Sequence, residues 1–186
     1  RSYFQGKREL FEGLAMEKLE KNWVKRPVLH LDLNIGKYDT PDSLDKILDN
    51  AISQWEAIYG TGIAEATLAL RFKGILERAY KQTGERVAIL IDEYDKPLLQ
   101  AIGNHDLQRE FRNTLKPFYG VLKTMDGCIK FALLTGVTKF GKVSVFSDLN
   151  NLMDISMDNR YIEICGITEK EIHTYLENEL RVLADA

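Results

Sequence analysis

The sequence predicts an α/β fold with a mostly parallel sheet, and three observations support this prediction. Strand-like and helix-like segments alternate along the 186 residues, which is the order of parallel strands joined by helical connections. Residues 87–91 form an unbroken apolar run, typical of a strand buried on both faces. That run ends in Asp92 and Glu93, at the edge where open α/β sheets place their ligand crevice.

The first third of the sequence is expected to hold one helix and one strand before the first long helix. Residues 7–22 are predicted to form a polar helix, and residues 28–33 a short strand with His30 and Asp32 on one face. Thr40, followed by proline and an acid, is expected to cap a helix that ends before Gly60. Its apolar stripe is Leu44, Ile47, Leu48, Ala51, Ile52 and Trp55.

The remaining elements follow from the same patterns. A second amphipathic helix ends at Gly84, before the strand 87–91. A helix is predicted over about 106–125, bent at Pro117. The inward stripe of this helix consists of Leu107, Phe111, Leu115, Phe118 and Leu122. The inward stripe of the preceding helix consists of Leu68, Phe72, Ile75, Leu76 and Ala79.

Two further strands and a last helix complete the predicted fold. A buried strand over 129–134 ends at Thr135, and a polar loop over 136–157 follows that is long enough to indicate a function. Residues 161–165 are predicted to form the last strand. A capping box over 168–171 then opens a final helix with Ile172, Leu176, Leu180 and Leu183 inward.

Composition restricts the class of protein. With 45% apolar and 28% charged residues, residues 1–186 are interpreted as a single partial domain of a soluble protein. A net charge of −3 does not indicate nucleic acid as a partner, and no apolar stretch is long enough to span a membrane. Cys128 and Cys165 are isolated from each other in the sequence, which indicates reduced thiols and a cytoplasmic location.

The acidic strand end has the pattern of a Walker B strand in a P-loop NTPase. There the first acid, here Asp92, holds Mg²⁺ through its water shell, and the second, here Glu93, polarises the water that attacks the γ-phosphate of ATP. A buried strand whose end is simply acidic and solvated explains this run equally well. Thr135, at the end of the next strand, fits a sensor of the γ-phosphate, although a turn-capping hydroxyl is the alternative.

A Walker A motif, G-x-x-x-x-G-K-[ST], is needed to cradle the phosphates. Residues 136–143 match its glycine and lysine spacing, but Val143 replaces the hydroxyl and the segment follows the acidic strand. We therefore interpret this match as fortuitous and expect the P-loop strand to precede Arg1. Asp95 is expected either to add charge near Mg²⁺ or to cap a loop, and Arg160 to form a surface ion pair or to act as an arginine finger.

Two other enzyme classes are not supported. Restriction-type nucleases carry [DE]-x-K on a strand, and that triplet does not occur in the sequence. Hydrolases with a Ser-His-Asp triad of the α/β type carry G-x-S-x-G, which is also absent.

Five stretches together resemble the bacterial AAA-ATPase-like family. They are Glu9–Leu14, Pro27–Asp32, Ile91–Pro97, Leu134–Phe140 and Ile164–Thr168. The resemblance implies a P-loop NTPase-like core of the additional-strand class, a three-layer αβα arrangement, with the N-terminal P-loop strand missing from this fragment. It also implies a metal role for Asp92, catalytic roles for Glu93 and Thr135, ATP and Mg²⁺ as ligand and cofactor, and often a fused PD-(D/E)XK nuclease-like domain downstream.

The expected function is therefore an ATPase module that acts as a conformational switch. The 186 residues alone are expected to be inactive because they lack a Walker A motif. The alternative is a scaffold that does not hydrolyse ATP and positions a fused nuclease or a protein partner. A sheet without its P-loop strand exposes ladder groups, so self-association is a further expectation.

Overall fold

A computed structural model describes residues 1–137, 151–164 and 167–184 of the chain. The described chain divides into two compact units, residues 1–151 and 152–186. The larger unit contains the sheet and all the predicted site residues, and each unit is described by itself below.

The larger unit contains a three-stranded parallel sheet. Its strands are β1 (Val28–Asp32), β2 (Val87–Asp92) and β3 (Ile129–Leu134), in the order β1-β2-β3. All three strands were predicted from apolar patterns, and the α/β class is confirmed. Because the strands are parallel, their carboxyl ends lie at one edge of the sheet.

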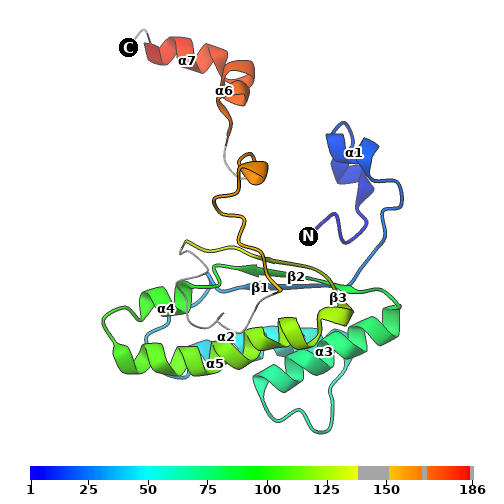
Figure 1. Ribbon diagram of the computed structural model, residues 1–186, viewed down its shortest axis with the longest axis vertical. Helices are drawn as coiled ribbons and strands as arrows, with labels where there is room; N and C mark the ends of the chain where they lie inside the picture. Colours follow the sequence, from blue (N-terminus) through cyan, green and yellow to red (C-terminus); the bar gives the residue numbers. More distant parts are fainter. Residues whose placement is uncertain (138–150, 165–166, 185–186) are drawn as a thin grey trace. The chain divides into compact units, whose positions relative to one another are not determined.

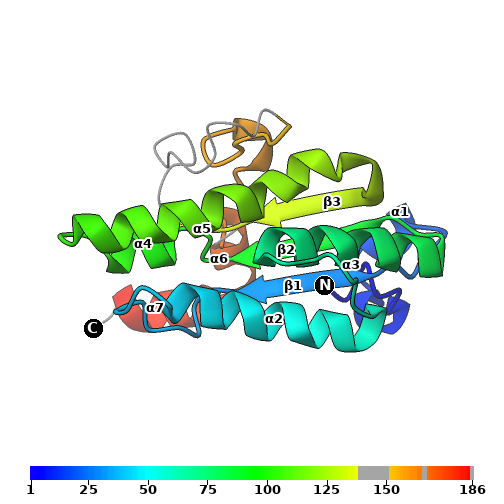
Figure 2. The same ribbon diagram turned by 90° about the horizontal axis from the view of Figure 1, so that it is seen from below.

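Three long helices cover one face of this sheet. They are α2 (Ser43–Tyr59), α3 (Leu68–Thr83) and α5 (His105–Thr124), with the short α4 (Lys96–Gln100) before α5. Figures 1 and 2 show the long helices on the same side of the strands. Phe72 and Phe118 stack between α3 and α5, with ring centroids 4.6 Å apart. The predicted stripes are buried at Leu44, Leu48, Ile52, Trp55, Phe72, Ile75, Leu76, Ala79, Leu107, Phe111, Leu115, Phe118 and Leu122.

Local signals set most of the helix boundaries. Gly84 adopts a left-handed φ of 70° and ends α3, as predicted. Thr67 and Asn104 cap α3 and α5 through their side chains. The Thr40 hydroxyl does not cap α2, because it donates to the Asp42 carboxylate over 2.8 Å. The helix α5 continues through Pro117.

The two faces of the sheet differ in what covers them. Leu29 and Leu31 are buried, whereas His30 between them is exposed, so the predicted alternation in β1 is confirmed. On the exposed face Phe131 is 40% exposed and packs against Phe4, with ring centroids 5.2 Å apart. In the described part of the chain, long helices cover only one face of the sheet, so these residues do not show the three-layer arrangement.

The strand β3 was expected to be buried, but most of its residues are half-buried or exposed. Its inner edge pairs with β2, and among the described residues no strand pairs with its outer edge. An edge strand with one open face keeps part of its surface in solvent, which explains this partial exposure.

The amino-terminal segment forms two short elements instead of the predicted helix over 7–22. These are a 3₁₀ helix, η1 (Arg8–Phe11), and α1 (Ala15–Leu19). Gly13 between them has a φ of 79°, which a continuous α-helix does not allow. Edge-to-face and tilted contacts among Tyr3, Phe11 and Trp23 hold this segment together in place of one helical face.

The smaller unit differs most from the sequence-based expectation. The described part of the predicted strand 161–165 is a 3₁₀ turn, η5 (Asn159–Tyr161), followed by further turns, and Cys165 lies outside the described residues. A short strand needs a hydrogen-bonded neighbour, and in the described chain this segment has none. The prediction of a last strand is therefore wrong for these residues.

The final helix is present but broken into two. The predicted capping box of Thr168 and Glu171 is confirmed, and it opens α6 (Glu169–Tyr175). A second helix, α7 (Glu177–Ala184), follows directly. The residues predicted to point inward are exposed or half-buried within this unit, because the described part of it forms no core.

Candidate functional site

Asp92 and Thr135 meet at the carboxyl edge of the sheet. Asp92 ends β2, Thr135 follows β3, and the Thr135 hydroxyl donates a hydrogen bond to Oδ1 of Asp92. Both residues are exposed. The sequence predicted this proximity only indirectly, from the rule that parallel strands end at the same edge.

Glu93 lies in a turn that interrupts the pairing of β2 with β3. The N–H of Thr135 donates to the carbonyl of Ile91 over 2.9 Å, so the ladder would continue through the N–H of Glu93. The N–H of Tyr94 donates to the carbonyl of Thr135 instead, over 2.9 Å. The backbone φ of Glu93 is 55°, in the left-handed region that few residues other than glycine adopt. Glu93 is therefore displaced from the ladder.

The turn after β2 is also held from the side of the helices. The Tyr119 hydroxyl, on α5, donates to the carbonyl of Tyr94 over 3.0 Å. Tyr119 is fully buried, and this burial raises its pKa well above the usual value. The phenol therefore stays protonated and keeps donating throughout the physiological pH range.

Asp95 is the buried acid of this region. It is 1% exposed, and its Oδ2 accepts from the N–H of Val137 over 3.2 Å. It directly precedes α4, but its side chain makes no hydrogen bond that caps this helix. The geometry matches one of the two roles predicted for Asp95, the capping of a loop. The capped group is the N–H of Val137, in the loop after β3.

Asp32 is an acid of this edge that the sequence reasoning did not assign to the site. It is the register partner of Asp92 on β1, and its Oδ1 accepts from the N–H of Asn34 over 2.8 Å. The Lys96 ammonium donates to Asn34 in turn. A signal was present, because an acid ends the first predicted strand in the same way as Asp92 ends the next.

The donor chemistry of this edge fits Mg²⁺. Carboxylate and hydroxyl oxygens are hard ligands, and Mg²⁺ is usually bound by one or two carboxylates together with water and substrate phosphates. In the described part of the chain, no three His, Cys, Asp or Glu side chains form a metal-binding group.

Several other predicted features belong to the smaller unit or fall outside the described residues. Residues 138–143 of the Walker A-like match and most of the loop 136–157 lie within residues 138–150, which the structure does not describe. In the smaller unit Arg160 forms an exposed ion pair with Asp158 over 2.6 Å, the surface alternative predicted for it. None of the helices in the described ranges is long and apolar enough to cross a bilayer.

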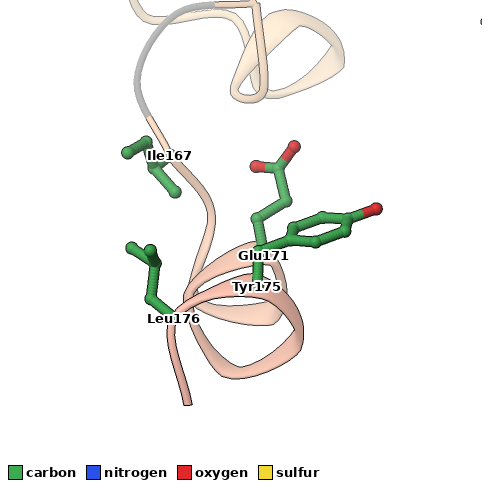
Figure 3. Close-up of a pocket in the computed structure, with 4 residues that line it drawn as sticks. All are labelled: Ile167, Glu171, Tyr175 and Leu176. Carbon is green, nitrogen blue, oxygen red and sulfur yellow. The ribbon is translucent and has the colours of Figure 1, made fainter. Parts of the chain in front are cut away.

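The smaller unit has a shallow pocket lined by four residues. Ile167 and Leu176 line one side of it, and Glu171 and Tyr175 the other (Figure 3). The Glu171 carboxylate accepts from the backbone and the hydroxyl of Thr168, and these hydrogen bonds lower its pKa. The Glu171 carboxylate in this pocket is therefore engaged in capping α6.

Comparisons with known proteins identify the family of this chain and a related protein. The sequence profile of a family described as "Predicted AAA-ATPase" matches residues 1–146. An uncharacterised protein from the vnfD 5′ region of Azotobacter chroococcum mcd 1 is 37% identical over 178 residues. That match covers 95% of this chain but 34% of the relative, so the chain spans about a third of the relative's length. No solved structure matches the chain.

Proposed function

The chain belongs to the predicted AAA-ATPase family, and from this premise we propose that its sheet edge is the acidic half of an ATP-hydrolysing site. In this proposal the protein binds Mg²⁺-ATP with a P-loop outside these 186 residues and uses hydrolysis to drive a conformational switch. The fold is proposed to be P-loop-like, of the class with an additional strand beside the Walker B strand.

One observation carries the proposal most directly. The strand that follows the acidic strand in the sequence also lies beside it in the sheet, and its terminal hydroxyl contacts the first acid. This places a hydroxyl next to the acid that would hold the metal, which supports a role for Thr135 as a sensor of the γ-phosphate. A solvated acidic strand end, the simpler alternative, does not require a hydroxyl at that position.

Each side chain has a distinct proposed role. Asp92 would hold Mg²⁺ through the water shell of the ion, and the bound metal would supply positive charge to neutralise the phosphates of ATP. Glu93, displaced from the ladder, takes a proton from the attacking water. The Thr135 hydroxyl donates to Asp92 and holds this carboxylate in position, and its free lone pair accepts a hydrogen bond from the attacking water and so orients that water.

We expect ATP hydrolysis that requires Mg²⁺ and Asp92. The natural full-length protein and the 186-residue chain are assayed in parallel for phosphate release, with and without EDTA. EDTA should abolish turnover by the full-length protein, and Asp92→Asn should lower kcat/KM by about 10- to 100-fold, because metal affinity depends on such water-bridged carboxylates.

A matched control separates this effect from loss of a surface charge. Asp126 is exposed and precedes the opposite end of β3, so Asp126→Asn should leave turnover unchanged. Equal activity of the wild-type protein and the Asp92→Asn variant would contradict the metal role. Absence of both turnover and ATP binding in the full-length protein would contradict the proposed function itself.

The Thr135 hydroxyl gives a separate prediction. Thr135→Val keeps the shape of the side chain but removes the donor to Asp92, and kcat should fall on the order of 10²-fold if that hydroxyl stabilises the transition state. Thr135→Ser keeps a hydroxyl and should retain most of the activity. A Val variant as active as the Ser variant would leave Thr135 with only a turn-capping role.

The scaffold alternative keeps one supporting observation, the exposed apolar surface of the smaller unit. Ile162, Tyr175, Val182 and Leu183 are all largely exposed there. Such surface is a candidate for contacts with further domains or partners. A protein that binds ATP but does not turn it over, with or without Glu93, would favour a scaffold.

A further inference from the structure

We infer that Asp95 is a positioning residue that fastens the loop after β3 to the turn that carries Glu93. Its consequence for catalysis rests on the proposed function, whereas the fastening itself is a property of the fold. Three features of Asp95 and its neighbours support this role.

The Asp95 carboxylate is buried. A buried carboxylate is costly unless hydrogen bonds compensate for the water it loses. Asp95 is 1% exposed and makes no side-chain capping bond to α4, the helix it precedes. Its described hydrogen bond runs to the N–H of Val137, 42 residues further along the chain. The buried Asp95 carboxylate therefore links two loops, and its side chain does not cap α4.

Gly136 lies between Thr135 and Val137 and in close contact with the turn after β2. A Cβ atom added to Gly136 would lie 2.6 Å from Oδ1 of Asp95 and 2.7 Å from the ring of Tyr94. These distances are shorter than real Cβ contacts, so the backbone after β3 packs directly on Tyr94 and Asp95. A side chain at residue 136 would push the two loops apart.

Glu93 lies in the chain between Asp92, which Thr135 contacts, and Tyr94 and Asp95, which are linked to Thr135 and Val137. The left-handed conformation is unfavourable for a residue with a side chain, and such strain persists only where surrounding contacts enforce it. Tyr94 is held by Thr135 and Tyr119, and Asp95 by Val137. Asp95 thus closes the set of contacts that keeps Glu93 displaced from the ladder and Thr135 beside Asp92.

Amide hydrogen exchange on the 186-residue chain tests the fastening without any assay of activity. Asp95→Ala removes the acceptor, so the amides of Tyr94, Thr135 and Val137 should exchange about tenfold faster, the effect of losing one such hydrogen bond. Asp95→Asn keeps an acceptor oxygen and should cause a smaller change. The amide of Leu33, which donates to the backbone carbonyl of Asp92 from the β1 side, should keep its rate in both variants.

Two exchange results would overturn the inference. Unchanged rates at Tyr94 and Thr135 in the Ala variant would show that Asp95 does not fasten the loops. A uniform increase that includes Leu33 would show a general loss of stability instead of a local link.

Kinetics of the full-length protein then test the catalytic consequence. We expect kcat to fall about tenfold in Asp95→Ala and less in Asp95→Asn, with the Kd for ATP unchanged within about twofold, because positioning affects the transition state more than ground-state binding. A wild-type kcat in Asp95→Ala would overturn the positioning role. If the wild-type protein does not hydrolyse ATP, the proposed function fails, and the exchange pattern still decides whether Asp95 fastens the loops.

Discussion

The Glu93→Gln variant of the full-length protein should bind ATP as well as the wild type and hydrolyse it about 10²- to 10⁴-fold more slowly, the range for loss of a general base. Glutamine has the shape of glutamate but accepts no proton from the attacking water. Because Glu93 makes no side-chain hydrogen bond that the structure describes, the substitution should leave the turn intact. The measurements are single-turnover hydrolysis and equilibrium binding of ATP.

The conformation of Glu93 makes a second substitution informative. Glycine adopts a φ of 55° without strain, so Glu93→Gly should fold with stability close to that of the wild type and yet be as inactive as the Gln variant. As a control, Glu110→Gln removes an exposed acid from α5 and should change neither binding nor turnover. Full activity in Glu93→Gln would remove Glu93 from the mechanism and favour the scaffold.

The central elements of the fold could be predicted because their signals are local. The run 87–91, the stripe that includes Phe111 and Phe118, and Gly84 at the end of α3 each carry their own evidence in sequence. The hydrophobic period selects strand or helix, and burial then follows from it. The α/β class was correctly predicted on this basis.

The elements that were predicted wrongly depend on partners that a local pattern does not contain. Residues 161–164 have the composition of a strand, but a strand forms only beside another edge, and the described residues offer them none. Residues 7–22 have apolar spacing suited to a helix, but Gly13 and the contacts of Tyr3 with Phe11 and Trp23 favour two shorter elements.

The candidate site was predictable as a set of residue types and not as a geometry. Asp92, Glu93 and Thr135 stand out because each follows an apolar run. Local sequence patterns predict neither the left-handed backbone of Glu93 nor the link from Asp95 to Val137. Both features result from contacts between loops that are distant in the sequence. Asp32 was identified as a strand residue, but its place beside Asp92 depends on strand order.

The largest expected effect on stability is that of Phe118→Ala. Phe118 is 1% exposed and stacks on Phe72, so truncation leaves a cavity between α5 and α3. Phe-to-Ala changes in cores cost about 3–5 kcal/mol, a large fraction of the roughly 5–15 kcal/mol that stabilises a domain. Urea unfolding of the 186-residue chain, followed by circular dichroism, measures this loss.

Two comparisons show whether the loss arises from the cavity. Phe118→Leu refills most of the volume and should cost about 1.5 kcal/mol or less. Ile58→Ala on α2 removes a side chain that is 67% exposed and should change stability by about 0.5 kcal/mol at most. An Ala variant at residue 118 with wild-type stability would show that α5 does not need this contact with α3. The helix α5 also carries Tyr119, which donates to the carbonyl of Tyr94 in the turn after β2. The same result would therefore show that packing of α5 on α3 is not what keeps this turn in place.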